Sequence, residues 1–540
     1  MNIVRKIKEF LVTFKIDENN FLSLSMLMIN LLFMNSNSLH LIINRISELN
    51  LIKSLQFIHD DISYFFGENE IPSGDLIMNE HIPPYFLDFL ISNIIVHSDL
   101  NGKNSLFDSQ TRFNICEPLN QIQNQANRKL IQEDYMSFLR TFRYNQEKMQ
   151  RVSDPRVAFY RYYYIFNNPQ VNKSFKEKNS ISIESYFGWS IFCYVAYRYT
   201  NTFCYKVDSF IPPKLEKQDL TAINFVLGKI CRSFDELKKL CRDHQTSKKS
   251  IFLFDELSPH VRYPLFSLNN KIYCVIPDYI LRALLGGFYF IFDLPNNQAK
   301  NIVAERFEKY VGVLFEHFFA NTEISYVKEI SYSYKKQAKK TSDWIFWNSG
   351  EIAFLDCKLK RMSLDGKKNA NIDNNVIESI LIEKNFSRKY KHEVLEKLRH
   401  GLTKDIVDLG IDVGKILVSY DDYCNDRINS LRYMGPKKFY AFLLTVEESY
   451  MNLYKDKILK IAKAYFSYKT KKDDLNLDPG SIRIISAKTL EEDINLVRYN
   501  NKIDMLGKGI HTNSNLDNFL IKKFKKELID PFMDKFKDVI

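Results

Sequence analysis

The chain has 540 residues, of which 45% are hydrophobic and 26% are charged. This composition is typical of globular proteins and excludes a disordered or fibrous class, and the length predicts two or three domains. The net charge of +11 favours a polyanionic partner such as nucleic acid, because each phosphate contact releases condensed counterions. The eight Cys form no CxxC pair, so the sequence offers neither a zinc ribbon nor a thioredoxin-like site.

The strongest apolar run near the N-terminus, Phe21 to Met34, is interrupted by Ser23, Ser25 and Asn30. It is shorter than the ~20 residues needed to span a bilayer, and no small-residue cleavage site follows it. We therefore interpret it as a buried helix and expect no membrane segment. Together with the cysteine usage, this predicts a cytoplasmic protein.

Residues 1–250 contain few Gly or Pro and show apolar residues at helical spacing, which predicts a mainly helical domain. By analogy alone, this domain would serve sensing, assembly or partner binding. The predicted helices include Phe21–Phe33, Leu39–Phe57, Ile122–Phe142 and Tyr186–Tyr199. The aromatic run Phe159–Tyr164 could stack on bases, but we favour core packing. The lysine-rich stretch Lys238–Lys249 is interpreted as an exposed join between domains.

Residues 251–490 alternate between short apolar runs and helical stretches, which is typical of an α/β layer structure. A hairpin is expected around Asn269-Asn270, followed by a helix from Pro277 to Leu285. The other predicted strands are Glu323–Tyr334, Asp343–Trp347, Ile352–Leu359, Lys415–Tyr420, Tyr440–Val446 and Ile482–Ser486. The other predicted helices are Ala299–Phe319, Asn375–Leu398 and Glu448–Tyr468. Residues 491–540 are expected to form a helical tail, amphipathic and basic from Phe519 to Phe536.

Two carboxylates and a lysine are expected to converge at the ends of two of these strands. Asp356 and Lys358 share one face of a strand, about 7 Å apart along it. Asp343 opens the preceding run, and a hairpin between the two runs would bring its carboxylate beside Asp356. Two carboxylates bind a hard divalent ion such as Mg²⁺, while the lysine could orient or deprotonate water, or neutralise a phosphate. The alternative is an exposed strand end with a surface ion pair.

These residues resemble the motif of the PD-(D/E)xK nuclease superfamily, which has the restriction-endonuclease-like fold. In that family an Asp opens one strand and an acid-x-Lys triplet lies on the next. Ser342-Asp343 stands where the family commonly has Pro-Asp, and Asp356-Cys357-Lys358 matches the second part. The resemblance covers about residues 300–450, and it implies a mixed-sheet α/β core and Mg²⁺- or Mn²⁺-dependent cleavage of nucleic acid, DNA more readily than RNA.

The family often adds a Glu from the preceding helix as a further metal ligand, and the candidates here are Glu305, Glu308 and Glu316. Measured at 100° per residue, Glu308 lies about 90° from the centre of the helix's apolar stripe, and the other two lie about 150–170° away. A ligand must face the sheet edge rather than solvent. We therefore expect Glu308 to be the ligand.

Several lysines are candidates for contacts with the nucleic-acid backbone. They are Lys335, Lys336, Lys339 and Lys340 in an expected loop before Asp343, and Lys384 on a following helix. The alternative for each is a solvated charged face.

Two other interpretations of the function fit the same residues. One is a catalytically inactive nucleic-acid-binding or scaffold protein that keeps the nuclease fold, and the other is a helical partner-binding protein in which the triplet is coincidental. Fusions of a helical domain with such a nuclease suggest, by analogy alone, a role in bacterial defence against phage or foreign DNA, with a protein partner or homo-oligomer formed through residues 1–250.

Overall fold

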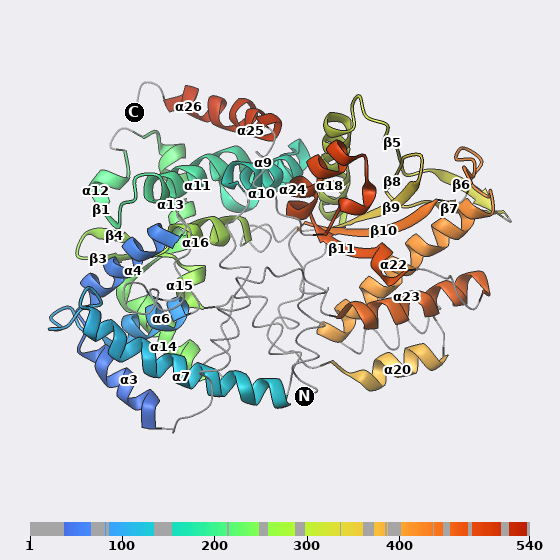
Figure 1. Ribbon diagram of the computed structural model, residues 1–540. Helices are drawn as coiled ribbons and strands as arrows, with labels where there is room; N and C mark the ends of the chain where they lie inside the picture. The colour runs from blue at the N-terminus through green and yellow to red at the C-terminus, as the bar shows by residue number, and fades with distance from the viewer. Residues whose placement is uncertain are drawn as a thin grey trace. The chain divides into compact units, whose positions relative to one another are not determined.

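The computed structural model, whose helices and strands are labelled in Figure 1, divides into two compact units. Unit 1 comprises Met1–Val152, Gly188–Phe292 and Phe536–Ile540, and unit 2 comprises Ser153–Phe187 and Asp293–Lys535. The structure describes residues 37–65, 82, 86–133, 154–212, 215–247, 258–286, 297–334, 336–359, 372–383, 386, 401–435, 437–446, 454–472, 478–508 and 518–536. The units therefore divide the chain at positions other than residues 250 and 490, which were predicted as domain boundaries.

Unit 1 is mainly helical, with one small sheet within its described residues. Its helices are α3 Asn37–Ser47, α4 Leu51–Phe65, α6 Leu87–His97, α7 Ser109–Glu133, α12 Val207–Phe210, α13 Lys217–Ile230, α14 Phe234–Ser247, α15 Pro259–Arg262, α16 Pro277–Leu281 and the π-helix η2 Arg282–Gly286. Helix α11 Ile183–Arg198 runs from one unit into the other. The sheet has the order β1-β4-β3-β2, with β1 Cys204–Lys206, β2 Cys231–Ser233, β3 Leu265–Leu268 and β4 Lys271–Cys274.

The predicted hairpin is confirmed, because β3 and β4 pair antiparallel on either side of Asn269 and Asn270. Both asparagines have positive φ, 49° and 57°, as a two-residue type I′ turn requires. The predicted helix from Pro277 is also present, although it continues as a π-helix after Leu281.

Three expectations for the N-terminal half have different outcomes. The range Leu39–Phe57 forms two helices, α3 and α4, rather than one. The stretch Lys238–Lys249 is not a join as far as it is described, because residues 238–247 belong to α14, whose Leu237 and Cys241 are buried in the core of unit 1. The lysines lie among apolar residues at helical spacing, and that spacing buries one face. The range Phe21–Phe33 lies outside the described residues.

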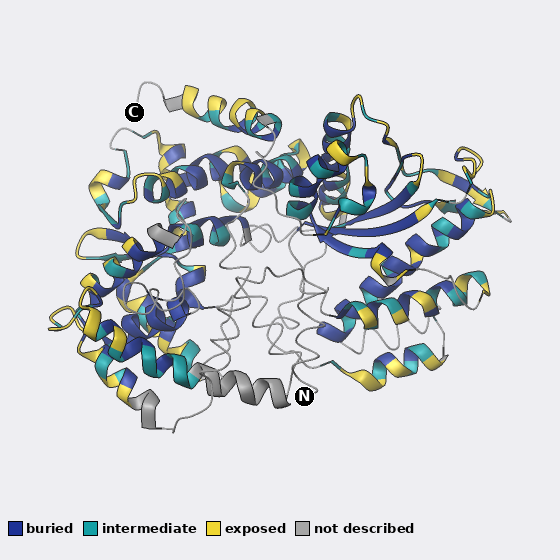
Figure 2. Cartoon of the chain, viewed as in Figure 1, coloured by how far each residue is buried: buried dark blue, intermediate teal, exposed yellow. Residues whose placement is uncertain are grey.

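Unit 2 contains a mixed sheet with the order β11-β10-β9-β8-β5 in its described residues. Its strands are β5 Ser325–Lys328, β8 Trp344–Trp347, β9 Glu351–Lys358, β10 Lys438–Thr445 and β11 Ile482–Ser486. Strand β8 is antiparallel to β5 and β9, whereas β9, β10 and β11 are mutually parallel. Figure 2 shows β9 and β10 buried along most of their length. Parallel strands are buried in this way when helices cover both faces of the sheet.

Helices cover both faces of this sheet. Helices α18 Asn297–Phe318 and α24 Ala487–Asn500 contact each other and the sheet, while α22 Leu402–Cys424 contacts β9 and β10. Alternate side chains distinguish the faces: Phe346 meets Phe315 of α18, and Phe354 meets Tyr420 of α22. The remaining elements of unit 2 are α9 Pro155–Phe166, α10 Pro169–Asn179, α20 Asn374–Glu383, α23 Lys455–Thr470, η5 Pro479–Ser481, η6 Ile503–Met505, α25 Asn518–Phe524, η7 Lys525–Ile529 and α26 Asp530–Phe536. Unit 2 is therefore a mixed α/β structure.

One predicted strand is wrong. The run Lys415–Tyr420 lies inside α22, where its Ile416 and Leu417 continue the buried helical stripe of that long helix. A short apolar run cannot by itself distinguish a buried strand from a segment of a buried helix.

The predicted strand Glu323–Tyr334 and the predicted loop after it form three strands instead. The first forms two strands, β5 and β6 Ser331–Tyr334, and β6 pairs with β7 Gln337–Lys340, which had been expected to belong to the loop. In β6, Tyr332 and Tyr334 alternate with serines, whereas the mostly polar β7 does not carry the alternating apolar pattern that indicates a strand.

The aromatic run Phe159–Tyr164 lies in α9, where Phe159, Tyr160 and Tyr162 are buried, so its packing role is confirmed. Of the predicted helix Asn375–Leu398, α20 covers the first part, and most residues after Glu383 lie outside the described ranges. In the parts of the chain that the structure describes, no helix is both long and apolar enough to cross a bilayer.

Candidate active site

The structure brings Asp343, Asp356 and Lys358 together at one edge of the unit 2 sheet. Asp356 and Lys358 occupy alternate positions near the end of β9, and Lys358 Nζ lies 3.3 Å from Asp356 Oδ2. Asp343 immediately precedes β8, which pairs antiparallel with β9. The Asp343 amide donates to Asp356 Oδ1 at 3.3 Å, and the Cys357 amide donates to Asp343 Oδ2 at 2.6 Å. The expected hairpin therefore places the two carboxylates side by side.

The electrostatics of this cluster follow from burial and from repulsion between the two acids. Burial, reinforced by the neighbouring charge of Asp356, raises the pKa of Asp343 to about 7. Burial alone would lower the pKa of Lys358, but the carboxylates of Asp356, Asp412 and Asp343 outweigh it and raise that pKa above its usual value. Lys358 is therefore a permanent cation at neutral pH, while Asp343 titrates near neutrality.

Glu308 of α18 reaches the same edge from the other face of the sheet. Its backbone carbonyl accepts a hydrogen bond from Trp344 Nε1 at 3.2 Å, and its side chain is 23% exposed. Burial raises the pKa of Glu308, whose charge in turn raises that of Asp343. The alternative candidates Glu305 and Glu316 are exposed to solvent.

Gly312 allows α18 to approach the sheet closely at this point. A Cβ at Gly312 would lie 2.8 Å from Cζ2 of Trp344, which is closer than side-chain carbons normally pack. The ring of Trp344 also meets Phe315 edge-on, at a centroid distance of 5.5 Å. The close contact between helix and strand fixes Glu308 near the two aspartates.

The donor set fits a hard divalent cation. Asp343 and Asp356 are neighbouring carboxylates whose mutual repulsion a cation would relieve, and carboxylate oxygens are the preferred ligands of Mg²⁺. Among the described residues, no group of three or more His, Cys, Asp and Glu is arranged to hold a metal ion. An ion held by two carboxylates would complete its shell with water and substrate oxygens, as Mg²⁺ commonly does.

The five lysines proposed as contacts with the nucleic-acid backbone differ in their surroundings. Lys335 and Lys384 lie outside the described residues, and Lys336 is exposed in the β6–β7 turn with φ 61°. Lys339 Nζ donates to Asp422 Oδ2 at 2.7 Å, and Lys340 Nζ donates to Glu329 Oε1 at 2.8 Å. Lys339 thus belongs to an internal network, whereas Lys340 remains at the surface.

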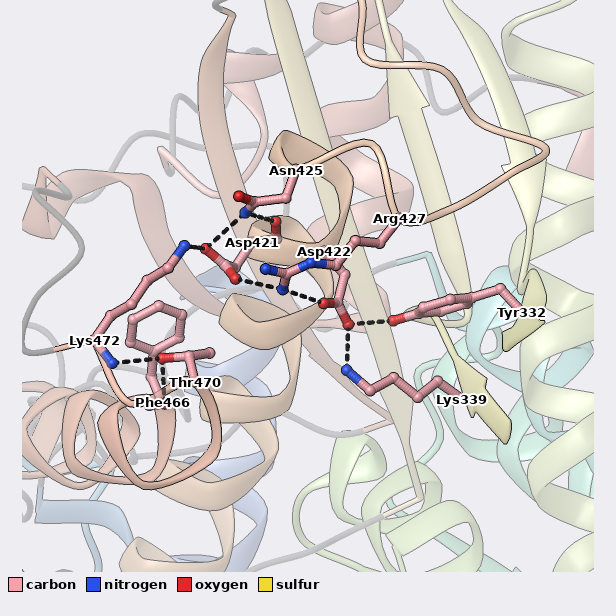
Figure 3. A network of polar contacts seen from close by, with 9 residues as sticks. All are labelled: Tyr332, Lys339, Asp421, Asp422, Asn425, Arg427, Phe466, Thr470 and Lys472. Carbon is pink, nitrogen blue, oxygen red and sulfur yellow. Dashed lines mark hydrogen bonds and ion pairs between the residues drawn. The ribbon is translucent and has the colours of Figure 1, made fainter. Parts of the chain in front are cut away.

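That network surrounds two adjacent acids near the end of α22, Asp421 and Asp422 (Figure 3), and no pattern in the sequence predicts it. Asp422, 1% exposed, accepts hydrogen bonds from Tyr332 at 2.6 Å, from Lys339 and from Arg427 at 2.9 Å. Burial opposes its ionisation, yet these donors hold its pKa below the usual value. Asp421 is bonded to Arg427 and to Lys472 of the segment after α23. The network fixes β6 and β7 to α22.

A second polar cluster lies in unit 1. Ser258 Oγ is 3.0 Å from His260 Nδ1, and His260 Nε2 is 3.1 Å from Asp88, which also accepts from Tyr279 at 2.6 Å. The order resembles a nucleophile, base and acid relay. All four side chains are buried, however, so the cluster serves to join α6, α15 and α16.

Comparisons of this chain with protein-family models, with curated proteins and with solved structures gave no match.

Proposed function

We propose that unit 2 is a metal-dependent nuclease of the restriction-endonuclease-like type, which hydrolyses phosphodiester bonds, preferentially in DNA. The observation that supports this most directly is the convergence of Asp343, Asp356 and Lys358 across the β8–β9 pair. A half-buried Glu308 beside them adds a third acid at the same edge. The preference for DNA, and a role in bacterial defence, rest on the family resemblance alone.

In this proposal Asp343 and Asp356 hold Mg²⁺ or Mn²⁺, with Glu308 nearby. When bound, the ion supplies an activated water and offsets charge on the scissile phosphate. The carboxylates hold the pKa of Lys358 above its usual value before any ion binds, and its ammonium would stabilise negative charge on a phosphate oxygen. The amide of Cys357 fixes the Asp343 carboxylate through a 2.6 Å hydrogen bond, which orients one ligand before any ion binds.

The proposal is tested by incubating plasmid, linear and single-stranded DNA, and RNA, with Mg²⁺, Mn²⁺ or EDTA. Asp356→Asn and Lys358→Met should each lower metal-dependent cutting by roughly a hundredfold or more, since the first removes a carboxylate ligand of the ion and the second removes a positive charge beside the reacting phosphate. Glu308→Gln should lower it as well. The matched control is Glu316→Gln, on the exposed side of the same helix, which should cut like the wild type.

Cutting that persists in both the Asp356 and the Lys358 variants would overturn this assignment of the site. Binding of nucleic acid without metal-dependent cutting would instead indicate a non-catalytic nucleic-acid-binding protein with this architecture. A partner that binds through the helices of unit 1 is a separate proposal, and co-purification with the full chain tests it.

A further inference from the structure

Four charged side chains gather near the ends of β5 and β7: Glu308, Lys328, Glu329 and Lys340. We call them the charged quartet. Lys328 Nζ lies 3.9 Å from Glu308 Oε2, and Lys340 Nζ lies 2.8 Å from Glu329 Oε1. The side chains of the lysines are 50% and 67% exposed, whereas those of the glutamates are 23% and 27% exposed. The ammonium groups therefore form the outer layer of the quartet.

The backbone joins the quartet directly to the candidate active site. The Glu329 amide donates to the carbonyl of Asp343 at 2.8 Å, and Lys328 is the cross-strand partner of Trp344, the residue after Asp343. The Thr341 amide adds a further backbone hydrogen bond between these segments, because it donates to the carbonyl of Ile330 at 3.0 Å. Lys328 and Lys340 are thus held beside Asp343 by strand pairing, not by flexible loops.

With a divalent cation bound, the charge balance of this edge would favour an anion next to the reacting centre. Glu308, Glu329, Asp343 and Asp356 provide four carboxylates, and Lys328, Lys340 and Lys358 provide three ammonium groups. With all seven groups ionised their sum is −1, and a divalent cation would change it to +1. Exposed ion pairs contribute only about 0–1 kcal/mol each, so a lysine can exchange its glutamate for a phosphate at little cost.

We propose that Lys328 and Lys340 bind backbone phosphates next to the scissile phosphodiester, so that the substrate is a nucleic-acid strand and not a mononucleotide or small diester. This rests on the proposed function for the identity of the scissile bond. Lys328 was not a candidate from the sequence, because it lies in a short strand with no basic neighbours in the preceding residues. Its role is visible only from its position beside Glu308.

The test measures binding separately from cutting. The dissociation constants of a 20-nucleotide single strand and a 20-base-pair duplex are measured with Ca²⁺, which carboxylates also bind, over a series of salt concentrations. The proteins are wild type, Lys328→Gln/Lys340→Gln and Lys328→Arg/Lys340→Arg. The control is Lys173→Gln/Lys176→Gln, which removes two exposed lysines three residues apart on α10.

The Gln pair should bind more weakly, and the slope of log K against log salt should fall by roughly 1.4 for the single strand and 1.8 for the duplex. The Arg pair and the α10 control should keep the wild-type slope. Metal-dependent hydrolysis of bis(p-nitrophenyl) phosphate, which has no flanking phosphate, should fall less in the Gln pair than cutting of a nucleic-acid strand does.

An unchanged salt slope in the Gln pair, or a wild type that binds neither nucleic acid, would overturn this inference. A reduced slope in a protein that cuts nothing with Mg²⁺ or Mn²⁺ would leave the phosphate contacts in place and refute the nuclease proposal instead. An unchanged slope together with cutting that Asp356→Asn abolishes would refute only the role of the two lysines.

Discussion

At the scale of single residues, the carboxyl group of Asp343 determines how the candidate site responds to pH. Burial and the charge of Asp356 raise its pKa to about 7, so in the absence of metal the folded protein binds a proton there that the unfolded chain releases near pH 4. A group whose pKa is raised on folding stabilises the protein at low pH, and that contribution is lost as pH rises through the folded pKa. Between about pH 4 and pH 7, Asp343 therefore makes the metal-free protein progressively less stable.

Asp343→Asn removes this titration because its amide stays neutral. In EDTA, the urea midpoint of the variant should exceed that of the wild type by more at pH 8 than at pH 5, where the wild-type carboxyl is largely protonated. Denaturation curves at the two pH values measure the difference. Glu316→Gln, at an exposed position, should show no such change. Equal shifts of Asp343→Asn at both pH values would mean that Asp343 is ionised throughout.

The three central site residues could be predicted because their proximity is a local property of the chain. Asp343 and Asp356 are 13 residues apart, and a single hairpin joins them. The contacts of Lys328 with Glu308 and of Lys339 with Asp422 could not be predicted in the same way. They depend on how α18 and α22 pack against the strands, and Lys339 is 83 residues from Asp422.

At the scale of elements, α22 and α23 pack closely through two glycines of α22. A Cβ at Gly410 would lie 2.6 Å from Cβ of Ile461, and a Cβ at Gly414 would lie 2.8 Å from Cδ1 of Tyr465 and 3.0 Å from the carbonyl oxygen of Ala462. These glycines therefore allow the two helices to approach. Helix α22 also covers the face of the sheet that carries Asp356 and Lys358. The contact between α22 and α23 therefore holds α22 in place beside the candidate site.

Gly414→Ala should destabilise the protein even though alanine is the better helix former. The gain in helix propensity is about 1 kcal/mol, whereas overpacking at a tight contact costs about 1–3 kcal/mol, so a net loss of up to about 2 kcal/mol is expected. Gly228→Ala in α13, where nothing lies within 4 Å of the added Cβ, should stabilise by up to about 1 kcal/mol. Urea denaturation of both variants tests the contrast, and a gain of stability at Gly414 would refute the close packing.

The order of elements was largely predictable where the apolar pattern is strong, as in β8 to β11 and the β3–β4 hairpin. The prediction was wrong where the apolar pattern is ambiguous or missing. The run Lys415–Tyr420 is apolar at a spacing compatible with either structure, and the polar strand β7 owes its conformation to pairing with β6 rather than to side-chain burial.

At the scale of the whole molecule, unit 2 is built from two separate stretches of the chain. Helix α9 belongs to it and contributes Arg161, whose guanidinium donates two hydrogen bonds of 2.7 Å to Glu491 of α24. Tyr310 of α18 donates a third to the same carboxylate, also at 2.7 Å. Arg306 of α18 donates in turn to the carbonyl of Tyr164. A boundary at residue 250 would separate these partners.

A fragment of residues 251–540 should therefore be markedly less stable than one in which residues 153–187 are joined to 293–540 by a flexible linker. The first leaves Glu491 buried without Arg161, and removing one partner of a buried ion pair costs about 3–5 kcal/mol. Thermal unfolding of the two fragments measures the difference. If residues 251–540 unfold at the same temperature as the linked fragment, α9 is dispensable to unit 2.

The interleaving of the two units also has a consequence for how the protein is made. Arg161 precedes Glu491 by 330 residues, so at roughly 10 residues per second a ribosome takes about half a minute to supply the second partner. Throughout that interval the aromatic face of α9 has emerged, while the helices that will cover it are still missing or incomplete. A nascent chain in this state exposes apolar surface of the kind that chaperones bind.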